Sequence, residues 1–294
     1  MLTYTLRRLA FAVPALLAIS FIIFAILDLA PSDPTAQLPL TIPPEVREKI
    51  RLSLGLGEPF AVRYWKWLVQ FFVNEPLNLI EQWTGWSFGD GDRLRVLSWQ
   101  TRSPVVDLIA QRMPQTLWVV GMSYVIGALI AIPIGVISAY RQYSWFDQFG
   151  TLFSMVGFSI PTFFTGLLFI VIFSVNLEWF PSIYDTTHRV TDWDSFVYQI
   201  KQMIMPTMVL GLYNASQISR FMRASMLDNL GQDYVRTARA KGMTEKVVVL
   251  VHVMRNSLIP VVTVLALNLP QVFGGAIITE QIFRVNGLGQ LLII

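Results

Sequence analysis

Residues 9–27 read LAFAVPALLAISFIIFAIL, a run of nineteen residues whose apolar character is interrupted only by Ser20. At about 1.5 Å per residue, a helix of this length spans roughly 28 Å, which is close to the hydrocarbon thickness of a bilayer. Arg7 and Arg8 precede the run. The apolar part of a cleaved signal peptide is shorter, roughly 7 to 15 residues. The run therefore predicts a retained transmembrane helix.

The composition of the whole chain agrees with this reading. Of the 294 residues, 54% are hydrophobic and 14% are charged, whereas a soluble domain carries about 25% charged residues. The net charge of +3 is too small to indicate a nucleic-acid partner, and no dense Lys/Arg block occurs. The chain has no cysteine, which excludes disulfides and thiolate metal sites. We predict an all-α integral membrane protein.

Four further apolar segments bring the predicted total to about five transmembrane helices. They are residues 117–137, 152–175, 203–218 and 258–278. Segment 203–218 is the weakest, because it is short and contains Pro206, Asn214 and Ser216. A helix packed against other helices tolerates such residues. Residues 291–294 resemble the first turn of another apolar helix, and we expect the sequence to stop short of a sixth span.

These segments divide the chain into three regions, residues 1–30, 31–116 and 117–294. Residues 31–116 form a polar stretch in which helical patterns begin at Pro43 and Phe60. Because tryptophan favours the headgroup depth of a membrane, we expect a compact external subdomain near the membrane surface. Its tryptophans are Trp65, Trp67, Trp83, Trp86 and Trp99.

The basic residues of the connecting segments predict the orientation. The N-terminal tail has two basic residues and no acidic one, and residues 219–257 have seven basic against three acidic ones. Residues 176–202 have two basic against four acidic ones, and the loop 140–149, with Arg141 and Asp147, is neutral. Basic segments stay in the cytoplasm. With five spans, the N-terminus and residues 219–257 are then cytoplasmic and residues 176–202 are external.

Motifs of catalysis are missing from the sequence. It contains no phosphate-binding glycine loop, no His-Glu-x-x-His and no Gly-x-Ser-x-Gly. The two histidines, His188 and His252, fall in opposite compartments in this topology. We expect Asp28 and Glu280 at span ends, where water reaches them, and no carboxylate near the midplane of the kind that ion-coupled carriers bury. We therefore predict that the chain is not an enzyme, binds no cofactor itself, and receives energy from another subunit.

Residues 226–258 carry the functional signal. Within them, residues 233–242 read DYVRTARAKG, in which small and basic residues alternate at helical spacing. Gly242 fits a helix C-terminus, and Thr244 with Glu245 begins a second short helix. The expected apolar face of that second helix is Val247, Val248, Leu250 and Val251. The pattern predicts an elbow of two helices around a glycine.

This run, with His252, Arg255, Asn256 and Pro260 after it, resembles the "EAA" motif of ABC importer permeases. It is most similar to the first-permease type of the dipeptide, oligopeptide and nickel branch. The general motif has Glu-Ala-Ala where this chain has Arg236, Thr237 and Ala238, and its later proline is displaced by Arg255. Further similar runs are residues 54–59 (LGLGEP), 103–117, 157–166 (GFSIPTFFTG) and 280–289 (EQIFRVNGLG).

The resemblance implies a type I permease fold in the bacterial cytoplasmic membrane. It implies a second permease subunit in a heterodimer, two cytoplasmic ATPase subunits that use ATP and Mg²⁺, an external substrate-binding protein, and surrounding lipid. In such permeases the elbow is a coupling helix seated in a groove of the ATPase. An elbow that only contacts lipid headgroups is the alternative. The expected coupling residues are Tyr234, Arg236, Thr237, Ala238, Arg239, Ala240, Lys241, Gly242, Thr244 and Glu245.

The substrate path and the cargo are less constrained by the sequence. Pro161, Gly157 and Gly166 would break or loosen the helix of the third span and expose backbone polar groups to a ligand. The residues expected on a substrate path are Gly157, Ser159, Pro161 and Gly166. Close packing of helices through small residues is the alternative. For cargo we expect di- or oligopeptides; nickel, an oligosaccharide or another small solute is the alternative within the family. An ion-coupled carrier and a membrane scaffold without transport are the alternatives outside it.

Overall fold

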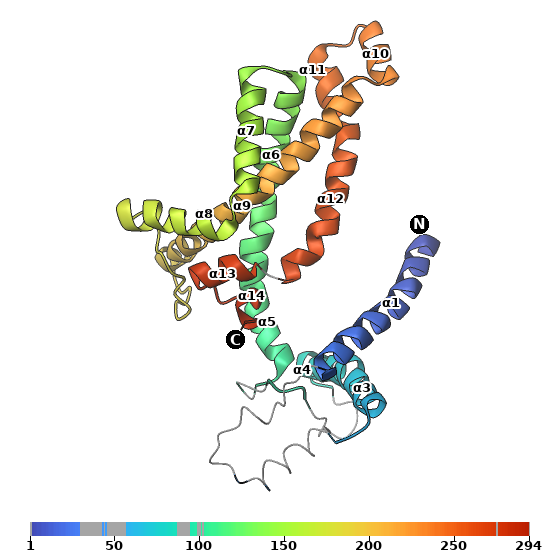
Figure 1. Ribbon diagram of the computed structural model, residues 1–294, viewed down its shortest axis with the longest axis vertical. Coiled ribbons are helices and arrows are strands. Elements are labelled where there is room, and N and C mark those ends of the chain that lie inside the picture. Colours follow the sequence, from blue (N-terminus) through green and yellow to red (C-terminus); the bar gives the residue numbers. More distant parts are fainter. Residues whose placement is uncertain are drawn as a thin grey trace. The chain divides into compact units, whose positions relative to one another are not determined.

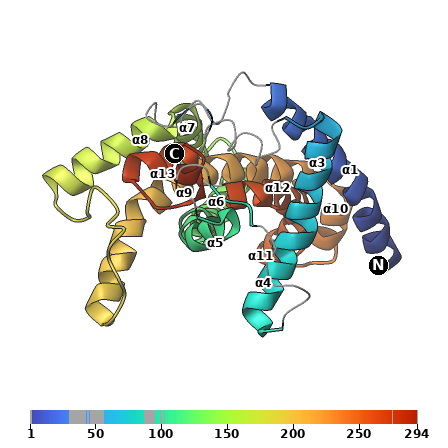
Figure 2. The same cartoon turned by 90° about the horizontal axis from the view of Figure 1, so that it is seen from below.

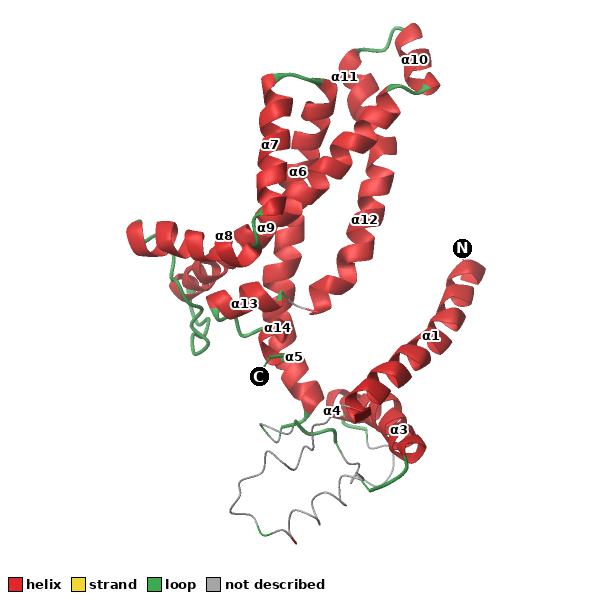
Figure 3. Ribbon diagram, viewed as in Figure 1, coloured by secondary structure: helices red, strands yellow, loops and turns green. Residues whose placement is uncertain are grey.

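The computed structural model describes residues 2–29, 43, 45, 57–86, 95–98, 101, 103–274 and 276–293. The described elements are all helices, with no strand among them (Figure 3). This confirms the all-α class. The chain divides into two compact units, Met1–Leu108 and Ile109–Ile294, and each is described by itself.

The first unit is built around α1 (Leu2–Leu29), which contains the apolar run. The predicted helix at Phe60 is confirmed as α3 (Phe60–Val69), which continues through the π-helical turn η2 (Gln70–Asn74) into α4 (Glu75–Thr84). Helix α3 packs on α1 through aromatic rings, with Phe21 and Phe60 centred 5.4 Å apart. The hydroxyls of Ser20 and Tyr64 are 2.9 Å apart. The helix expected from Pro43 lies almost wholly outside the described residues.

A charged cluster closes the end of the first unit. Arg95 donates two hydrogen bonds of 2.9 Å to Asp107, and the Val96 N–H donates to Glu75 over 2.7 Å. Glu75 is only 2% exposed. The hydrogen bond to Asp107 raises the pKa of Arg95. A buried acid thus receives both a backbone donor and a permanently charged neighbour, which makes its burial tolerable.

The second unit is a bundle of long helices. Helix α5 (Val105–Thr116) continues through η3 (Leu117–Gly121) into α6 (Met122–Tyr140), and the three form one helix of 36 residues. The elements after it are α7 (Trp145–Ser159), α8 (Thr162–Phe169), η4 (Ile170–Asn176), α9 (Trp193–Leu230), α10 (Asp233–Ala240), α11 (Glu245–Val247), η5 (Val248–Val253), α12 (Met254–Gly274), α13 (Ile277–Phe283) and α14 (Leu288–Leu291).

Helix α9 contacts α6, α7 and α12, and it crosses α6 along much of its length (Figures 1 and 2). Glycines allow the close approach, since a Cβ added at Gly135 would lie 2.6 Å from the Cβ of Met222. Polar side chains join the helices as well: Ser225 and Ser257 each donate to the other's carbonyl, over 2.9 and 3.2 Å. In lipid, burial of apolar surface contributes little to helix association, so helices are held together by close packing of small residues and by hydrogen bonds from hydroxyls.

Among the residues that the structure describes, three helices are long and apolar enough to cross a membrane, namely Thr3–Leu29, Val105–Tyr140 and Glu245–Gly274. A fourth is added if the bent pair Trp145–Ser159 and Thr162–Asn176 is one span. The predicted segment 203–218 lies within α9, a helix of 38 residues that is too polar to be among them. The predicted segment 258–278 is displaced, because its helix begins at Glu245 and ends at Gly274.

The predicted span over residues 152–175 is broken in the structure. Helix α7 ends at Ser159, and the chain turns by 100° before α8 begins at Thr162 (Figure 1). Ile160 is extended, with φ −81° and ψ 123°. A residue before proline is driven out of the helical region, and Pro161 has no N–H to continue the ladder. The proline was visible in the sequence; the size of the bend was not.

Candidate coupling elbow and substrate path

The predicted elbow is present between α9 and α12, where α10 lies beyond the ends of both helices (Figure 1). Helix α10 ends in a Schellman motif. The Gly242 N–H donates to the Arg239 carbonyl over 2.9 Å, and the Met243 N–H donates to the Ala238 carbonyl over 3.3 Å. Gly242 has φ +74°, a left-handed conformation in which a Cβ is strained. The glycine therefore sets the turn.

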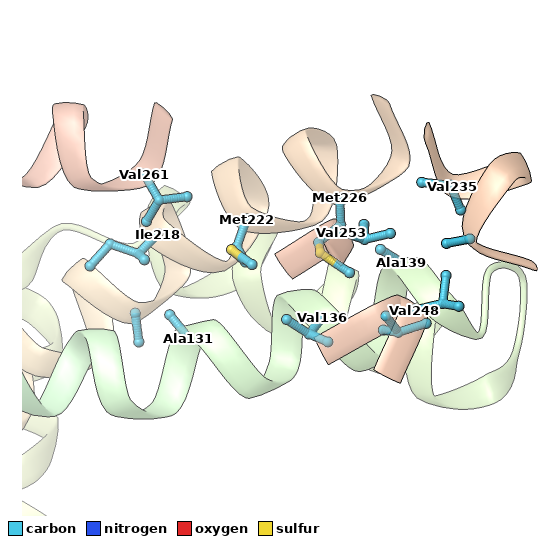
Figure 4. Packing of buried hydrophobic residues seen from close by; sticks show 13 residues of the cluster. Ala131, Val136, Ala139, Ile218, Met222, Met226, Val235, Val248, Val253 and Val261 are labelled. Atoms are coloured by element: carbon cyan, nitrogen blue, oxygen red, sulfur yellow. The ribbon is translucent and has the colours of Figure 1, made fainter. Parts of the chain in front are cut away.

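Two small residues fix the elbow to the bundle. Val235 is fully buried and Ala238 is 5% exposed, and both belong to the apolar cluster that contains Ala139, Met226 and Val248. Figure 4 shows Val235 and Val248 at one end of this cluster. The inner face of α10 is thus held by packing, and its opposite face is left free.

Most of the predicted coupling residues are exposed, either on α10 or in the turn that follows it. Within the isolated chain, the exposed ones are Tyr234, Arg236, Thr237, Arg239, Ala240, Lys241, Gly242 and Thr244. Glu245 is half-buried, and Ala238 points inward. The Tyr234 hydroxyl donates to the Asn229 side chain over 2.8 Å, which joins α10 to the end of α9. The elbow thus presents a basic, mostly polar surface on a rigid base.

An ion pair bridges the two sides of the Gly242 turn. Arg239 donates to the two carboxylate oxygens of Glu245 over 3.2 and 2.7 Å. The hydrogen bond to Glu245 raises the pKa of Arg239, so the guanidinium stays charged. Both side chains are more than a third exposed, and an ion pair of this kind contributes little to stability. The pair links the end of α10 to the start of the helix that follows it.

The second half of the elbow differs from the predicted short helix. Residues from Glu245 onward form the start of one 30-residue helix, Glu245–Gly274. Its buried residues are Val248, Val249 and Val253, while Val247, Leu250 and Val251 are exposed. The turn η5 has i to i+5 hydrogen bonds, which widen the helix and bring positions five apart onto one face. The predicted apolar face assumed ordinary α-helical spacing, and only Val248 of it is buried.

The residues predicted for a substrate path separate into two pairs. Ser159 and Pro161 line a concavity of about 780 Å³ at the bend between α7 and α8, together with Phe158, Thr162 and Tyr213. Gly157 packs directly on Ser216 of α9, and Gly166 lies against Phe283 of α13. The two glycines therefore allow close packing of helices, which was the alternative interpretation. We call the 780 Å³ hollow the bend concavity.

Sequence reasoning placed Glu280 in water, and this is wrong, because Glu280 is fully buried. The Thr116 hydroxyl donates to its carboxyl group over 2.9 Å, and the Gln290 N–H donates to it over 3.1 Å. The Leu288 N–H in turn donates to the Thr116 hydroxyl over 2.7 Å. Gly287 lies so close that an added Cβ would be 2.5 Å from the Thr116 hydroxyl oxygen. We call residues 280–290 the Glu280 turn.

A second buried acid was also missed. Asp147, treated above as part of a neutral loop, is 3% exposed and accepts two hydrogen bonds from Arg223, of 2.6 and 2.8 Å. The Tyr143 N–H adds a third, of 3.0 Å. The pair joins α7 to α9. The only signal in the sequence was one acid at the start of an apolar helix and one arginine 76 positions later. Among the described residues, no group of three or more His, Asp or Glu side chains could hold a metal ion.

The comparison with known proteins agrees with this architecture. Residues 131–294 match the family described as binding-protein-dependent transport system inner membrane component, and residues 1–120 match its N-terminal family. The chain belongs to this family. It is the integral membrane permease component of an ABC importer of the peptide and oligopeptide type, in the bacterial inner membrane. Proteins of this family are not themselves catalytic.

Two relatives illustrate the match. The chain is 37% identical to the oligopeptide transport system permease protein AppB of Bacillus subtilis, over all of this chain and 87% of that protein. It is 34% identical to the glutathione transport system permease protein GsiC of Salmonella paratyphi A, over all of this chain and 86% of that protein. The similarity thus extends over both units.

Proposed function

We propose that this chain moves short peptides across the cytoplasmic membrane as one of two different permease subunits of an ATP-driven importer. The names of both relatives, one an oligopeptide and one a glutathione permease, support a peptide-like cargo. Two ATPase subunits below the membrane bind ATP and Mg²⁺, and a binding protein delivers substrate from outside. The basic segments support a cytoplasmic N-terminus and a cytoplasmic elbow.

The elbow is the observation that carries the proposal. Its inner face is packed into the bundle by Val235 and Ala238, while residues such as Arg236 and Lys241 are exposed beyond the helix ends. Because α10 is packed firmly into the bundle, a displacement of its exposed surface moves the attached helices with it. When the ATPases close on ATP, they move the elbow, and α9 and α12 tilt with it. The nucleotide site and the substrate path then bias one two-state bundle, which is allosteric coupling.

The contact can be tested by cross-linking, because the chain has no cysteine of its own. A single cysteine is placed at Lys241 in the chain co-expressed with its transporter partners. We expect a bifunctional thiol reagent to capture a nucleotide-hydrolysing subunit. A cysteine at Lys201, near the opposite end of α9, is the matched control and should capture no ATPase. Failure to capture an ATPase from any of positions 234–245 would contradict the coupling role.

The cargo is tested separately in the complex reconstituted with its binding protein. ATP hydrolysis and uptake are measured against dipeptides, longer peptides and Ni²⁺. We expect stimulation by at least one class of peptide and none by Ni²⁺. Stimulation by Ni²⁺ alone would leave the importer intact and replace its cargo. Solute movement in vesicles without any ATPase subunit would instead favour an ion-coupled carrier.

A further inference from the structure

Helix α9 has a polar face that the rest of the bundle leaves uncovered. Tyr213, Gln217 and Arg220 follow one another at spacings of four and three residues, which places them on one side of a helix. The opposite side is buried in the apolar cluster, through Ile218 and Met222. Arg220 is exposed, and Tyr213 and Gln217 are half-buried. An exposed guanidinium beside two half-buried polar side chains offers hydrogen-bond donors to a ligand or a partner.

A hollow lies against this face. It has a volume of about 560 Å³ and is lined from α7 by Thr151, Met155 and Phe158 and from α9 by Gln217, Arg220 and Phe221. We call it the Arg220 concavity. Phe158 also lines the bend concavity, and its ring is stacked on Tyr213 with centroids 6.0 Å apart. Phe158 therefore lines both hollows, and we call the two together the track along α7 and α9.

The two arginines near this track differ in what they bind. Arg223 is occupied, since both its hydrogen bonds to Asp147 are shorter than 3 Å. Arg220 lies 5.5 Å from the centre of the Phe158 ring and forms no ion pair within the described part of the chain. An arginine held by an aromatic face keeps its hydrogen-bond donors free for a planar acceptor. A carboxylate is the acceptor that matches a guanidinium in two parallel hydrogen bonds.

We infer that Arg220 is a binding residue for the terminal carboxylate of a peptide in transit, at the elbow end of the track. Phe158 and Met155 supply apolar surface for side chains of varied size, and Gln217 supplies an amide for the peptide backbone. This inference rests on the proposed peptide cargo. Because the contact is partly exposed to water, it is weak enough for the peptide to leave. Weak binding suits a path through which the substrate must pass.

The test uses the reconstituted complex and the peptide that gives the highest uptake in the cargo panel. Uptake is measured for that peptide as the free acid and as its C-terminal amide, with the binding protein loaded to saturation in both cases. For the native complex we expect the acid to be preferred by about fivefold, the upper worth of a partly exposed ion pair. R220Q should abolish this preference. R220K keeps the positive charge but lacks the planar guanidinium that donates two parallel hydrogen bonds, and it should leave part of the preference. R141Q removes an exposed arginine outside both hollows and should leave the preference for the acid unchanged.

The role of Arg220 and the peptide-importer function fail on different outcomes of this test. An unchanged preference in R220Q, with ATP-driven peptide uptake intact, would overturn the role of Arg220 and leave the peptide importer standing. An equal loss of acid and amide uptake in R220Q that follows the anionic lipid content of the vesicles would overturn it in favour of a lipid phosphate. If the native complex moves no peptide, the proposed function itself fails.

Discussion

The elbow and the Glu280 turn each depend on a glycine, but for opposite physical reasons. At Gly242 the backbone has φ +74°, and an added Cβ would meet no described atom within 4 Å. At Gly287 no positive φ is found, and an added Cβ would collide with the carboxyl group of Glu280 and the hydroxyl of Thr116. The first glycine is required by conformation and the second by space.

The difference fits the coupling role proposed for the elbow. Open space around Gly242, with Lys241 and Arg236 exposed beside it, leaves room for another subunit's surface. The Glu280 turn is closed, since each oxygen of its central carboxyl group accepts a hydrogen bond from this same chain. Changes in the Glu280 turn should therefore act through stability, and changes in the elbow should act through coupling.

The largest loss of stability is expected for G287A. The new methyl group must displace a buried carboxyl group and its hydroxyl partner, and overpacking of this kind costs up to about 3 kcal/mol. Thermal unfolding of the purified chain in detergent measures the effect. G231A is the matched control, because Gly231 has φ −83° and its added Cβ meets no described atom within 4 Å. An unfolding temperature in G287A equal to that of the native chain would show that the turn is packed less tightly than its contacts indicate.

A smaller loss, of about 2 kcal/mol, is expected for E280Q, because one buried hydrogen bond becomes a clash of donors. The amide oxygen can still accept from Thr116, but the amide N–H groups would then face the N–H of Gln290. Unfolding in the same detergent measures the change, and ATP-driven uptake per folded complex should stay near the native value. A folded E280Q complex that hydrolyses ATP without uptake would assign the carboxyl group a part in transport.

The sequence made one of these turns far easier to predict than the other. Gly242 follows a short helical pattern, so its position at the end of the helix could be predicted from neighbouring residues alone. The partners of Glu280 include Thr116, 164 positions earlier in the chain, and no pattern in a single sequence pairs such positions. Asp147 and Arg223 were missed for the same reason.

In the fold as well, features set by local sequence were predicted and features set by long-range contacts were not. Apolar runs located α1, α6 and α12 because lipid contact is read directly from composition. The polar side chains of α9, such as Gln217 and Arg220, hid most of a helix of 38 residues, because they lower its mean hydropathy below that of a membrane span. The 100° bend after α7 could be located at Pro161, but its angle depends on packing between α8 and α13 that the sequence does not display.

In the elbow, G242V should cost only about 1–2 kcal/mol, the strain of a left-handed residue, and yet abolish coupling. We expect normal membrane insertion and continued ATP hydrolysis in the reconstituted complex, with uptake lost. G242N is the informative partner variant, because asparagine tolerates this conformation far better than valine. Uptake should therefore largely recover in G242N. If G242N is as defective as G242V, the partner needs empty space at this position and not the turn geometry; normal uptake by G242V would contradict the elbow mechanism.

The smallest effect on stability is expected for E245Q, below about 1 kcal/mol, because both side chains of its ion pair with Arg239 are more than a third exposed. E245Q should reduce coupling more than it reduces stability. Arg239 and Glu245 lie on opposite sides of Gly242, and we expect their ion pair to fix the angle between α10 and the helix that follows. We expect fewer peptides transported per ATP hydrolysed, with the unfolding temperature unchanged. The exchange R239E/E245R restores the pair with its charges reversed. Recovery of the transport ratio in that double variant would assign the pair to the shape of the elbow. If the ratio stays low although the bridge is restored, the guanidinium of Arg239 is itself part of the surface that the ATPase contacts.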